Sequence, residues 1–243
     1  MKSLTKFLLA TLLVAGSVIT SVANTAISIV KTHSSVDDRN LSGFTAVEVA
    51  GSFDVVISQS GNESVKVEAP SDIASRIITE VKGGVLKIYT KKGNWNWDSG
   101  DDKVIVHVNA KTLTSIALAG SGDVTFNGGI KGTSLALKLS GSGDVSGKVD
   151  VTNLETSIVG SGDIKVTGRA QNSVVKVAGS GDFTGTNLVT VNTTVKVVGS
   201  GDARVNASVK VDAAVAGSGD VYYTGGAKNV SSSTSGSGDI SKF

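Results

Sequence analysis

The tetrapeptide Gly-Ser-Gly-Asp occurs seven times in the C-terminal half of the chain, at an almost constant spacing. The copies begin at Gly120, Gly141, Gly160, Gly179, Gly199, Gly217 and Gly236, so successive copies are 21, 19, 19, 20, 18 and 19 residues apart. A repeat of about twenty residues that carries a turn signal is typical of a solenoid, in which each repeat is one stacked coil. A sandwich of hairpins also has short strands, but it does not explain why one tetrapeptide returns at the same phase. The sequence therefore predicts an all-β, right-handed parallel β-helix of about seven coils of 18–21 residues.

The residues around each tetrapeptide alternate between apolar and polar, which is the pattern of a strand with one buried face. The positions expected to point inward, two before the first glycine, hold Leu118, Leu139, Ile158, Val177, Val197, Val215 and Thr234. The residue after each Asp is again expected inside: Val124, Val145, Ile164, Phe183, Ala203, Val221 and Ile240. We expect two or three short strands per coil, separated by turns, with Lys138, Lys176 and Lys196 on the exposed face. The last repeat places Ser232 and Thr234 at core positions and is expected to be a polar cap.

The seven turn aspartates are expected to stack along one edge of the solenoid. They are Asp123, Asp144, Asp163, Asp182, Asp202, Asp220 and Asp239. At a strand spacing of about 4.8 Å, neighbouring carboxylates repel by roughly 3 kcal/mol at an effective dielectric constant of about 20. Either backbone amides of the same or the adjacent turn donate to them, or a row of calcium ions lies between them. We favour the amides and predict no cofactor, because the nine-residue Gly-Gly-x-Gly-x-Asp repeat of calcium-binding β-rolls is absent; calcium stays the alternative.

The periodicity divides the chain into four parts. Residues 1–23 read as a signal peptide, 24–40 as an N-terminal segment, 41–115 as a less regular strand-rich part, and 116–243 as the regular β-helix with its cap. Within the third part, Gly51-Ser52-Phe53-Asp54 is a degenerate copy of the turn, with Phe53 in place of the second glycine.

The first residues have the pattern of a cleavable export signal. Lys2 and Lys6 precede an apolar run from Phe7 to Ile19, and Ala23 ends a cleavage site of small residues. This run is shorter than the about 20 apolar residues of a membrane span, so we expect no integral span after cleavage. The chain has no Cys, which excludes disulfides and an acylated cysteine. We expect an exported protein that is periplasmic, on the outer surface or secreted.

The charge balance argues against a nucleic-acid partner. Removing residues 1–23 takes away two lysines, which leaves 23 − 2 = 21 basic residues against 21 acidic residues. Binding to nucleic acid needs clustered Lys or Arg, and the repeats show no basic stripe of that kind.

Three motifs ahead of the repeats carry a family resemblance. They are Phe44-x-x-Val47-x-Val49, Gly51-x-x-Asp54-Val55-x-Ile57 and Thr79-Glu80-Val81-x-x-Gly84-x-Leu86-x-Ile88. Together with the Gly-Ser-Gly-Asp coils, they resemble the bacterial family of putative auto-transporter adhesin head GIN domains, from about Leu41 to Phe243. The resemblance implies an exported β-solenoid that acts as an adhesin-like binding or structural module at the cell envelope.

The segment 93–102 is the most unusual stretch outside the repeats, because it holds both tryptophans of the chain. Its candidate binding residues are Asn94, Trp95, Asn96, Trp97 and Asp98. Exposed Trp beside Asn and Asp suits contacts with sugars, so a glycan is one candidate partner and an envelope protein is the other. The alternative is that the tryptophans fold back over one end of the solenoid.

Catalysis is not expected from the residue inventory. The chain has two histidines, His33 and His107, and neither belongs to a recognisable Ser-His-Asp arrangement. Polysaccharide-cleaving enzymes with a β-helix need acids and bases gathered in one cleft, whereas the column of Lys138, Lys176 and Lys196 lacks an acidic partner column. An enzyme acting on polysaccharide is therefore the least favoured alternative.

Overall fold

The computed structural model describes residues 35–91 and 103–243, which are 72% strand. The first seven strands and the helix are β1 Ser35–Asp38, β2 Ala46–Gly51, β3 Asp54–Gln59, β4 Ser64–Ala69, α1 Ser71–Ala74, β5 Ile77–Lys82, β6 Val85–Thr90 and β7 Ile105–Ala110. The repeats form β8 Ser115–Gly120, β9 Val124–Gly141, β10 Val145–Gly160, β11 Ile164–Gly179, β12 Phe183–Gly199, β13 Ala203–Gly217, β14 Val221–Thr224, β15 Asn229–Gly236 and β16 Ile240–Lys242.

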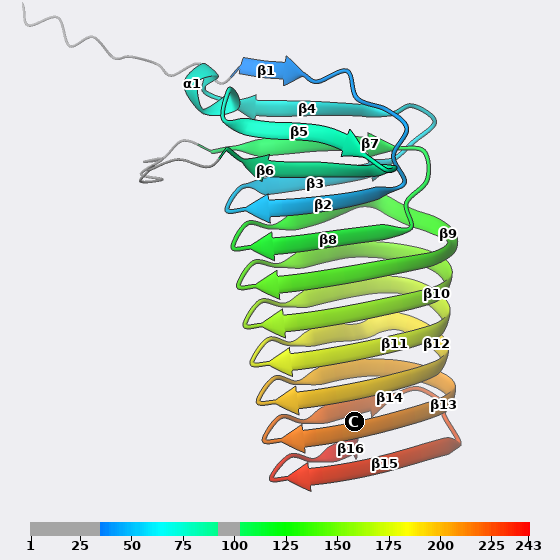
Figure 1. The fold of residues 1–243 in the computed structure, drawn as a ribbon. Coiled ribbons are helices and arrows are strands. Elements are labelled where there is room, and N and C mark those ends of the chain that lie inside the picture. The colour runs from blue at the N-terminus through cyan, green and yellow to red at the C-terminus, as the bar shows by residue number, and fades with distance from the viewer. Residues whose placement is uncertain (1–34, 92–102) are drawn as a thin grey trace, which may run out of the picture. The chain divides into compact units, whose positions relative to one another are not determined.

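The repeats build the predicted right-handed parallel solenoid. In Figure 1 the front strands run to the left, the chain turns behind them, and the back strands run to the right, one coil lower each time. The front sheet consists of β5, β6, β2, β8, the second halves of β9–β13, and β15. The back sheet consists of β1, β4, β7, β3, the first halves of β9–β13, β14 and β16. We call the side with the Gly-Ser-Gly-Asp turns the turn edge and the opposite side the bend edge.

The core lies between the two sheets and consists of the predicted columns. Leu118, Leu139, Ile158, Val177, Val197 and Val215 are each at most 3% exposed. Parallel pairing stacks equivalent residues of successive coils, for example Ile158 on Val177. The same register continues in the column that follows each Asp, from Val124 to Val221. In the last coil Ser232 and Thr234 are exposed, as is all of β15.

The coils of β9–β13 each cross the bend edge as one continuous strand, which corrects the expectation of two or three short strands separated by turns; in the last coil, β14 and β15 stay separate. Strands β9–β13 are 15–18 residues long and pair with their neighbours on both sheets. Glycines with positive φ, such as Gly168 at +106°, let the strand bend without leaving the ladder. The differences in repeat length are absorbed here, because the parallel register shifts at the bend, as between Lys165 and Gly168.

The strands before the repeats belong to the same stack, in an order that differs from the chain order. Strands β2 and β3 form a coil that lies between the β6–β7 coil and the β8–β9 coil. The chain then continues through β4, α1 and β5. Strand β4 pairs antiparallel with β7, and β5 pairs antiparallel with β6. Strand β1 is also antiparallel, to β4. The parallel β-helix is therefore closed at this end by antiparallel strands, which the periodicity alone did not predict.

The turns pack backbone on backbone. The carbonyl of each first glycine accepts hydrogen bonds from the Ser and second-glycine amides of the next coil, at 2.8–3.3 Å. The first glycines have φ between +118° and +142°, a region that other residues rarely adopt. A Cβ on either glycine would overlap the carbonyl oxygen of the equivalent glycine one coil earlier. Both glycines are therefore required by the stacking distance.

The degenerate turn at Gly51 confirms the predicted phase. Gly51 pairs in register with Gly120, and its carbonyl accepts hydrogen bonds from the amides of Ser121 and Gly122. Phe53 stands where the other turns have the second glycine, and its buried ring lies where a Cβ on Gly51 would point. The backbone of this turn thus binds the first regular turn in the same way as the other turns do, and the Phe53 ring occupies the space inside it.

No helix within residues 35–91 and 103–243 is long and apolar enough to cross a membrane.

Replacing the second glycine of a central turn should destabilise the whole stack. We expect Gly162→Ala to lower the free energy of unfolding by about 3 kcal/mol, because its Cβ would overlap the Gly143 carbonyl. For a domain of this size the melting temperature should fall by roughly 10 °C. Gly61→Ala is the matched control, since nothing lies within 4 Å of its Cβ and its φ is not positive. Equal melting temperatures for the two variants, measured by circular dichroism, would contradict the stacking argument.

Candidate functional site

The turn aspartates form a continuous hydrogen-bonded ladder along the turn edge. Each Asp amide donates to Oδ1 of the Asp one coil earlier, at 2.7–3.3 Å, beginning with the Asp123 amide and Asp54 Oδ1. Each Asp carbonyl accepts from the amide that follows the Asp of the preceding coil. The participants are Asp54, Asp123, Asp144, Asp163, Asp182, Asp202, Asp220 and Asp239.

This ladder gives every turn carboxylate from Asp54 to Asp220 a backbone donor from the adjacent coil, which is the arrangement that the sequence favours over a row of cations. An amide dipole directed at each carboxylate offsets part of the repulsion between neighbours. Within the described ranges, no three side chains of His, Cys, Asp or Glu converge to hold a metal ion. Calcium at the turn edge is tested by the experiment at the end of this subsection.

The tryptophan segment and His33 lie outside the described residues. The segment holds all five candidate binding residues: Asn94, Trp95, Asn96, Trp97 and Asp98. His107 is on β7, and its Nε2 lies 3.0 Å from Glu68 Oε2 on the neighbouring strand β4. Both side chains are about 40% exposed on the sheet surface, so they form a cross-strand pair in contact with solvent.

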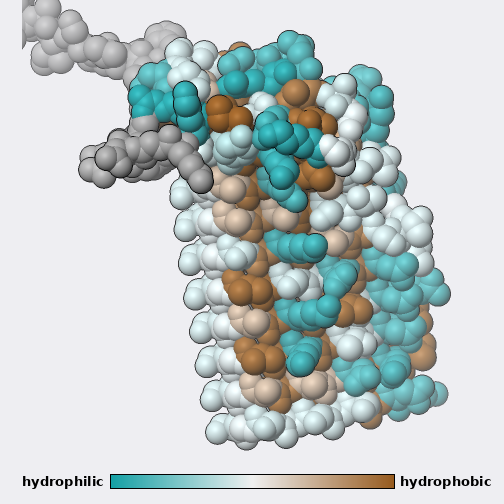
Figure 2. Space-filling view, in the orientation of Figure 1, coloured by the Kyte–Doolittle hydropathy of each residue, from teal (hydrophilic) through white to brown (hydrophobic). Residues whose placement is uncertain are grey.

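The front sheet carries a surface that the repeat alignment did not single out. Two shallow depressions of about 460 and 430 Å³ lie side by side on its outer face and share Glu155 and Lys176. The larger depression exists because Ala117, Ala119 and Ser157 are small. Figure 2 shows an apolar strip running down this face beside the turns, and exposed Val159 contributes to it. The front face thus combines apolar patches with charged groups.

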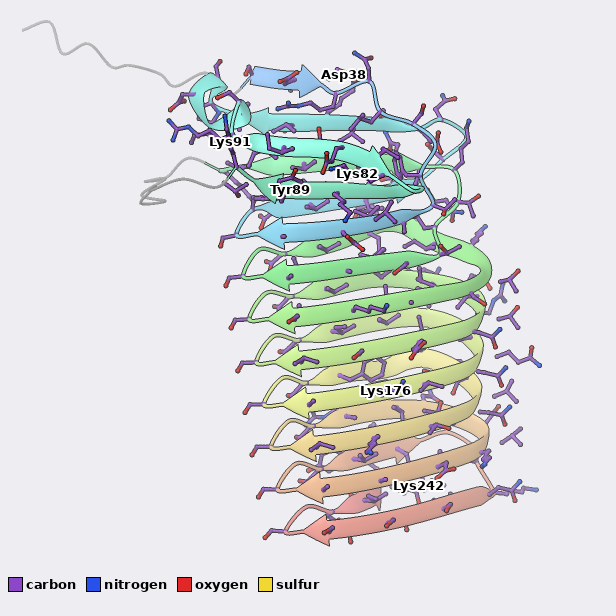
Figure 3. All side chains as sticks on the ribbon, in the orientation of Figure 1. Asp38, Lys82, Tyr89, Lys91, Lys176 and Lys242 are labelled. Atoms are coloured by element: carbon purple, nitrogen blue, oxygen red, sulfur yellow. The ribbon has the colours of Figure 1, made fainter. Side chains whose placement is uncertain are left out.

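An ion pair separates the two depressions. Lys176 Nζ lies 2.8 Å from Glu155 Oε1, and Figure 3 shows Lys176 on the front sheet. The nearby ammonium group lowers the pKa of the Glu155 carboxyl, through its hydrogen bond first and its charge second. The expectation from the sequence concerned an acidic column, and Glu155 is a single acid whose register neighbours are Ala136 and Val174. Glu155 and Lys176 sit on adjacent coils but two positions apart, a diagonal contact that a column-by-column comparison does not test.

The second depression is bordered by a ladder of asparagines. Asn172 Nδ2 donates to Asn153 Oδ1, and Asn192 Nδ2 donates to Asn172 Oδ1, both at 3.0 Å. Asn153 and Asn172 line the depression itself. Three amides in register, spaced by one coil, offer the same donor and acceptor groups at regular intervals. The sequence contains the signal for this ladder, because Asn153, Asn172 and Asn192 each lie seven residues before the first glycine of the turn that follows.

Comparison with known proteins gives a family and a fold. The family model described as "Putative auto-transporter adhesin, head GIN domain" matches residues 43–227. A search of curated proteins finds no match.

Three solved structures are similar to this chain. A crystal structure of a putative adhesin from Bacteroides fragilis is 25% identical, with a TM-score of 0.80, and the match covers 86% of this chain and 96% of that one. A putative lipid binding protein from Parabacteroides distasonis is also 25% identical, with a TM-score of 0.71 and coverage of 88% and 98%. A putative adhesin from Parabacteroides distasonis is 25% identical, with a TM-score of 0.67 and coverage of 86% and 96%. None of these three descriptions names an enzyme.

Two substitutions at one turn separate a backbone role of the aspartates from a metal role. We expect Asp163→Asn to change stability little, because the amide oxygen still accepts from the Asp182 amide. Asp163→Ala removes this acceptor and should cost about 1–3 kcal/mol of unfolding free energy. Melting temperatures are measured for both variants and the unaltered chain, in calcium and in chelator. Calcium stabilisation of the unaltered chain that Asp163→Asn abolishes would establish a metal site, whereas equal curves in calcium and chelator would exclude one.

Proposed function

The chain belongs to the family described as "Putative auto-transporter adhesin, head GIN domain", and on this premise we propose that it is an exported, non-enzymatic binding module of the bacterial cell envelope. The observation that carries the proposal is the pair of adjoining depressions on the front sheet, separated by the Glu155–Lys176 ion pair. They are shallow and open, which suits an extended ligand lying along the sheet better than a small molecule enclosed in a pocket.

The side chains of this face favour a glycan as the ligand. The asparagine ladder, Ser140 and Ser157 supply amide and hydroxyl groups, and Glu155 and Lys176 supply charged hydrogen-bonding groups. Small apolar side chains between them can contact the less polar faces of sugar rings. Because the coils repeat, the face offers these groups at a regular spacing of about 4.8 Å along the stack, which suits a repetitive polymer. An envelope protein is the other partner class, and the binding test separates the two.

The charged groups of the two front-sheet depressions favour a role in binding rather than catalysis. The ionised pairs of the front sheet are exposed, as with Lys176 and Glu155 at 55% and 54%. A general acid needs an environment that holds its proton near neutral pH, whereas the neighbouring ammonium lowers the pKa of Glu155. This pair is thus suited to hydrogen bonding with a ligand.

Binding of oligosaccharides should depend on the front sheet. The probes are immobilised neutral, amino-sugar and uronic-acid oligosaccharides, and binding is measured by surface plasmon resonance. We expect Lys176→Gln and Asn172→Ala each to weaken binding by roughly tenfold, because each removes a ligand-facing hydrogen-bonding group. Lys148→Gln, which lies on the bend edge, is the matched control for the loss of one charge. Lack of binding to every probe, or equal weakening by the control, would contradict a glycan site on this face.

Export should leave a defined new N-terminus. We expect the secreted or periplasmic protein to begin at Asn24, after cleavage at the small residues that end in Ala23. Intact mass spectrometry of the protein recovered from cell fractions measures this directly. Replacing Ala23 with Arg should block cleavage and retain the longer chain at the inner membrane. Recovery of the full-length chain from the cytosol alone would contradict the proposed export.

A further inference from the structure

The two edges of the solenoid carry opposite charges. The turn edge holds the eight aspartates of the ladder, and the seven Gly-Ser-Gly-Asp turns contain no basic residue. The bend edge of the repeats comprises residues 127–134, 148–153, 167–172, 186–192, 206–210 and 225–228. These stretches contain five cations, all exposed, and a single acid, Asp150. The cations are Lys131, Lys148, Arg169, Lys210 and Lys228. They form a basic stripe along this edge, which corrects the expectation that the repeats carry none.

The single acid of the bend edge is surrounded by cations. Arg169 donates to both carboxylate oxygens of Asp150, at 2.8 and 2.7 Å, and lies beside it in register. Lys131 is the register neighbour of Asp150 on the other side. Arg169 foremost, and then Lys131 and Lys148, lower the pKa of Asp150, so this carboxyl stays ionised and the cluster keeps an excess of two positive charges. Figure 3 shows nitrogen-tipped side chains projecting from this edge.

Exposed valines lie among these cations. Val189 is 54% exposed and pairs in register with Arg169. Val191 and Val209 are 37% and 46% exposed, and each directly precedes a member of the register pair Asn192–Lys210. The three valines therefore lie on the adjoining strands β12 and β13, with cations on both sides of them.

The Val189 side chain also borders a depression. This depression, of about 400 Å³, is lined by Lys148, Val149, Asp150, Gly168, Arg169 and Val189. It brings the cationic cluster and the edge of the valine patch together on one surface.

We propose that the bend edge is a docking surface for an anionic lipid bilayer. The cations would lie against lipid phosphates, and the valines would reach the boundary between headgroups and acyl chains. Anionic polysaccharide would be attracted by the same cations, but its sugar-ring faces are far less apolar than the acyl chains that the three exposed valines would reach. The acidic turn edge is repelled by the same bilayer, so the charge distribution sets the orientation of docking. The cations and valines of this proposal do not line the front-sheet depressions, so it does not depend on the glycan site, which it adjoins at the asparagine ladder.

Vesicle flotation tests the proposal. The unaltered chain is mixed with vesicles of phosphatidylcholine, or with vesicles in which about a third of the lipid is phosphatidylglycerol. We expect binding only to the second kind, weakening as salt is raised because the charges are screened. The full chain and a chain starting at Asn24 are both measured, since the apolar run Phe7 to Ile19 could insert by itself.

Two triple variants separate local charge from net charge. Lys148→Gln/Lys210→Gln/Lys228→Gln should reduce the partition coefficient roughly a hundredfold, at about fivefold per cation. The matched control, Lys165→Gln/Lys196→Gln/Lys242→Gln, removes three exposed lysines outside the bend edge and should have a much smaller effect. Equal losses in the two triples, or no binding of the unaltered chain to anionic vesicles, would overturn the proposal.

A third variant separates lipid from polysaccharide. Val189→Ser/Val191→Ser/Val209→Ser keeps the net charge and should weaken vesicle binding about tenfold, with no effect on binding to soluble dextran sulfate. If this variant binds both vesicles and dextran sulfate as strongly as the unaltered chain does, the valines do not contribute to binding. The edge would then be a purely electrostatic site, which contradicts the lipid proposal. Melting curves of every variant establish that the solenoid is intact.

Discussion

Backbone contact between successive Gly-Ser-Gly-Asp turns is the constraint on which the rest of the solenoid depends. The first-glycine carbonyl accepts two amides from the next coil, and neither glycine has room for a side chain. Every coil must therefore return to the same point at the same height. The differences in repeat length, from 18 to 21 residues, have to be absorbed elsewhere, and the register shifts place them at the bend edge. One edge is consequently uniform in sequence, whereas the other is free to vary in length, charge and apolar content.

The uniform edge creates an electrostatic problem that the ladder resolves internally. Eight carboxylates in one row repel each other, yet the first seven, from Asp54 to Asp220, each accept a hydrogen bond from an amide of the following coil, and that amide would otherwise be left unpaired at the turn. The aspartate side chain thus acts as a hydrogen-bond acceptor for the backbone of the next coil. This hydrogen bond explains how a row of carboxylates can form without cations between them. Its acidity still shapes the surface. Lys103 and Arg204 lie 3.7 and 3.6 Å from the carboxylates of Asp54 and Asp202, while five further exposed cations lie on the bend edge.

The sequence was sufficient to predict whatever depends on the phase within one repeat. The inward columns, the parallel stacking and the degenerate turn at Gly51 all follow from aligning the tetrapeptides, and the structure confirms them. The sequence could not predict contacts between segments that occupy different positions within the repeat or that lie outside the repeats. Strands β2 and β3 carry no signal that places them after the β6–β7 coil, and the Glu155–Lys176 pair is a diagonal contact between columns. The continuous strands were missed because bending glycines resemble turn glycines in a sequence.

The same constraint also decides where function can reside. The turn edge has its backbone and carboxylates engaged in stacking, and the interior is closely packed, so changes at either would disturb every neighbouring coil. The outer face of the front sheet and the bend edge are different, because their side chains point away from the core and can change without altering the coil. The cations and exposed valines of the bend edge do not line the front-sheet depressions, and the two surfaces meet at the asparagine ladder. A stack with one fixed edge therefore leaves two adjoining surfaces that can vary, and under the bilayer proposal the charge asymmetry would set which of them faces the membrane.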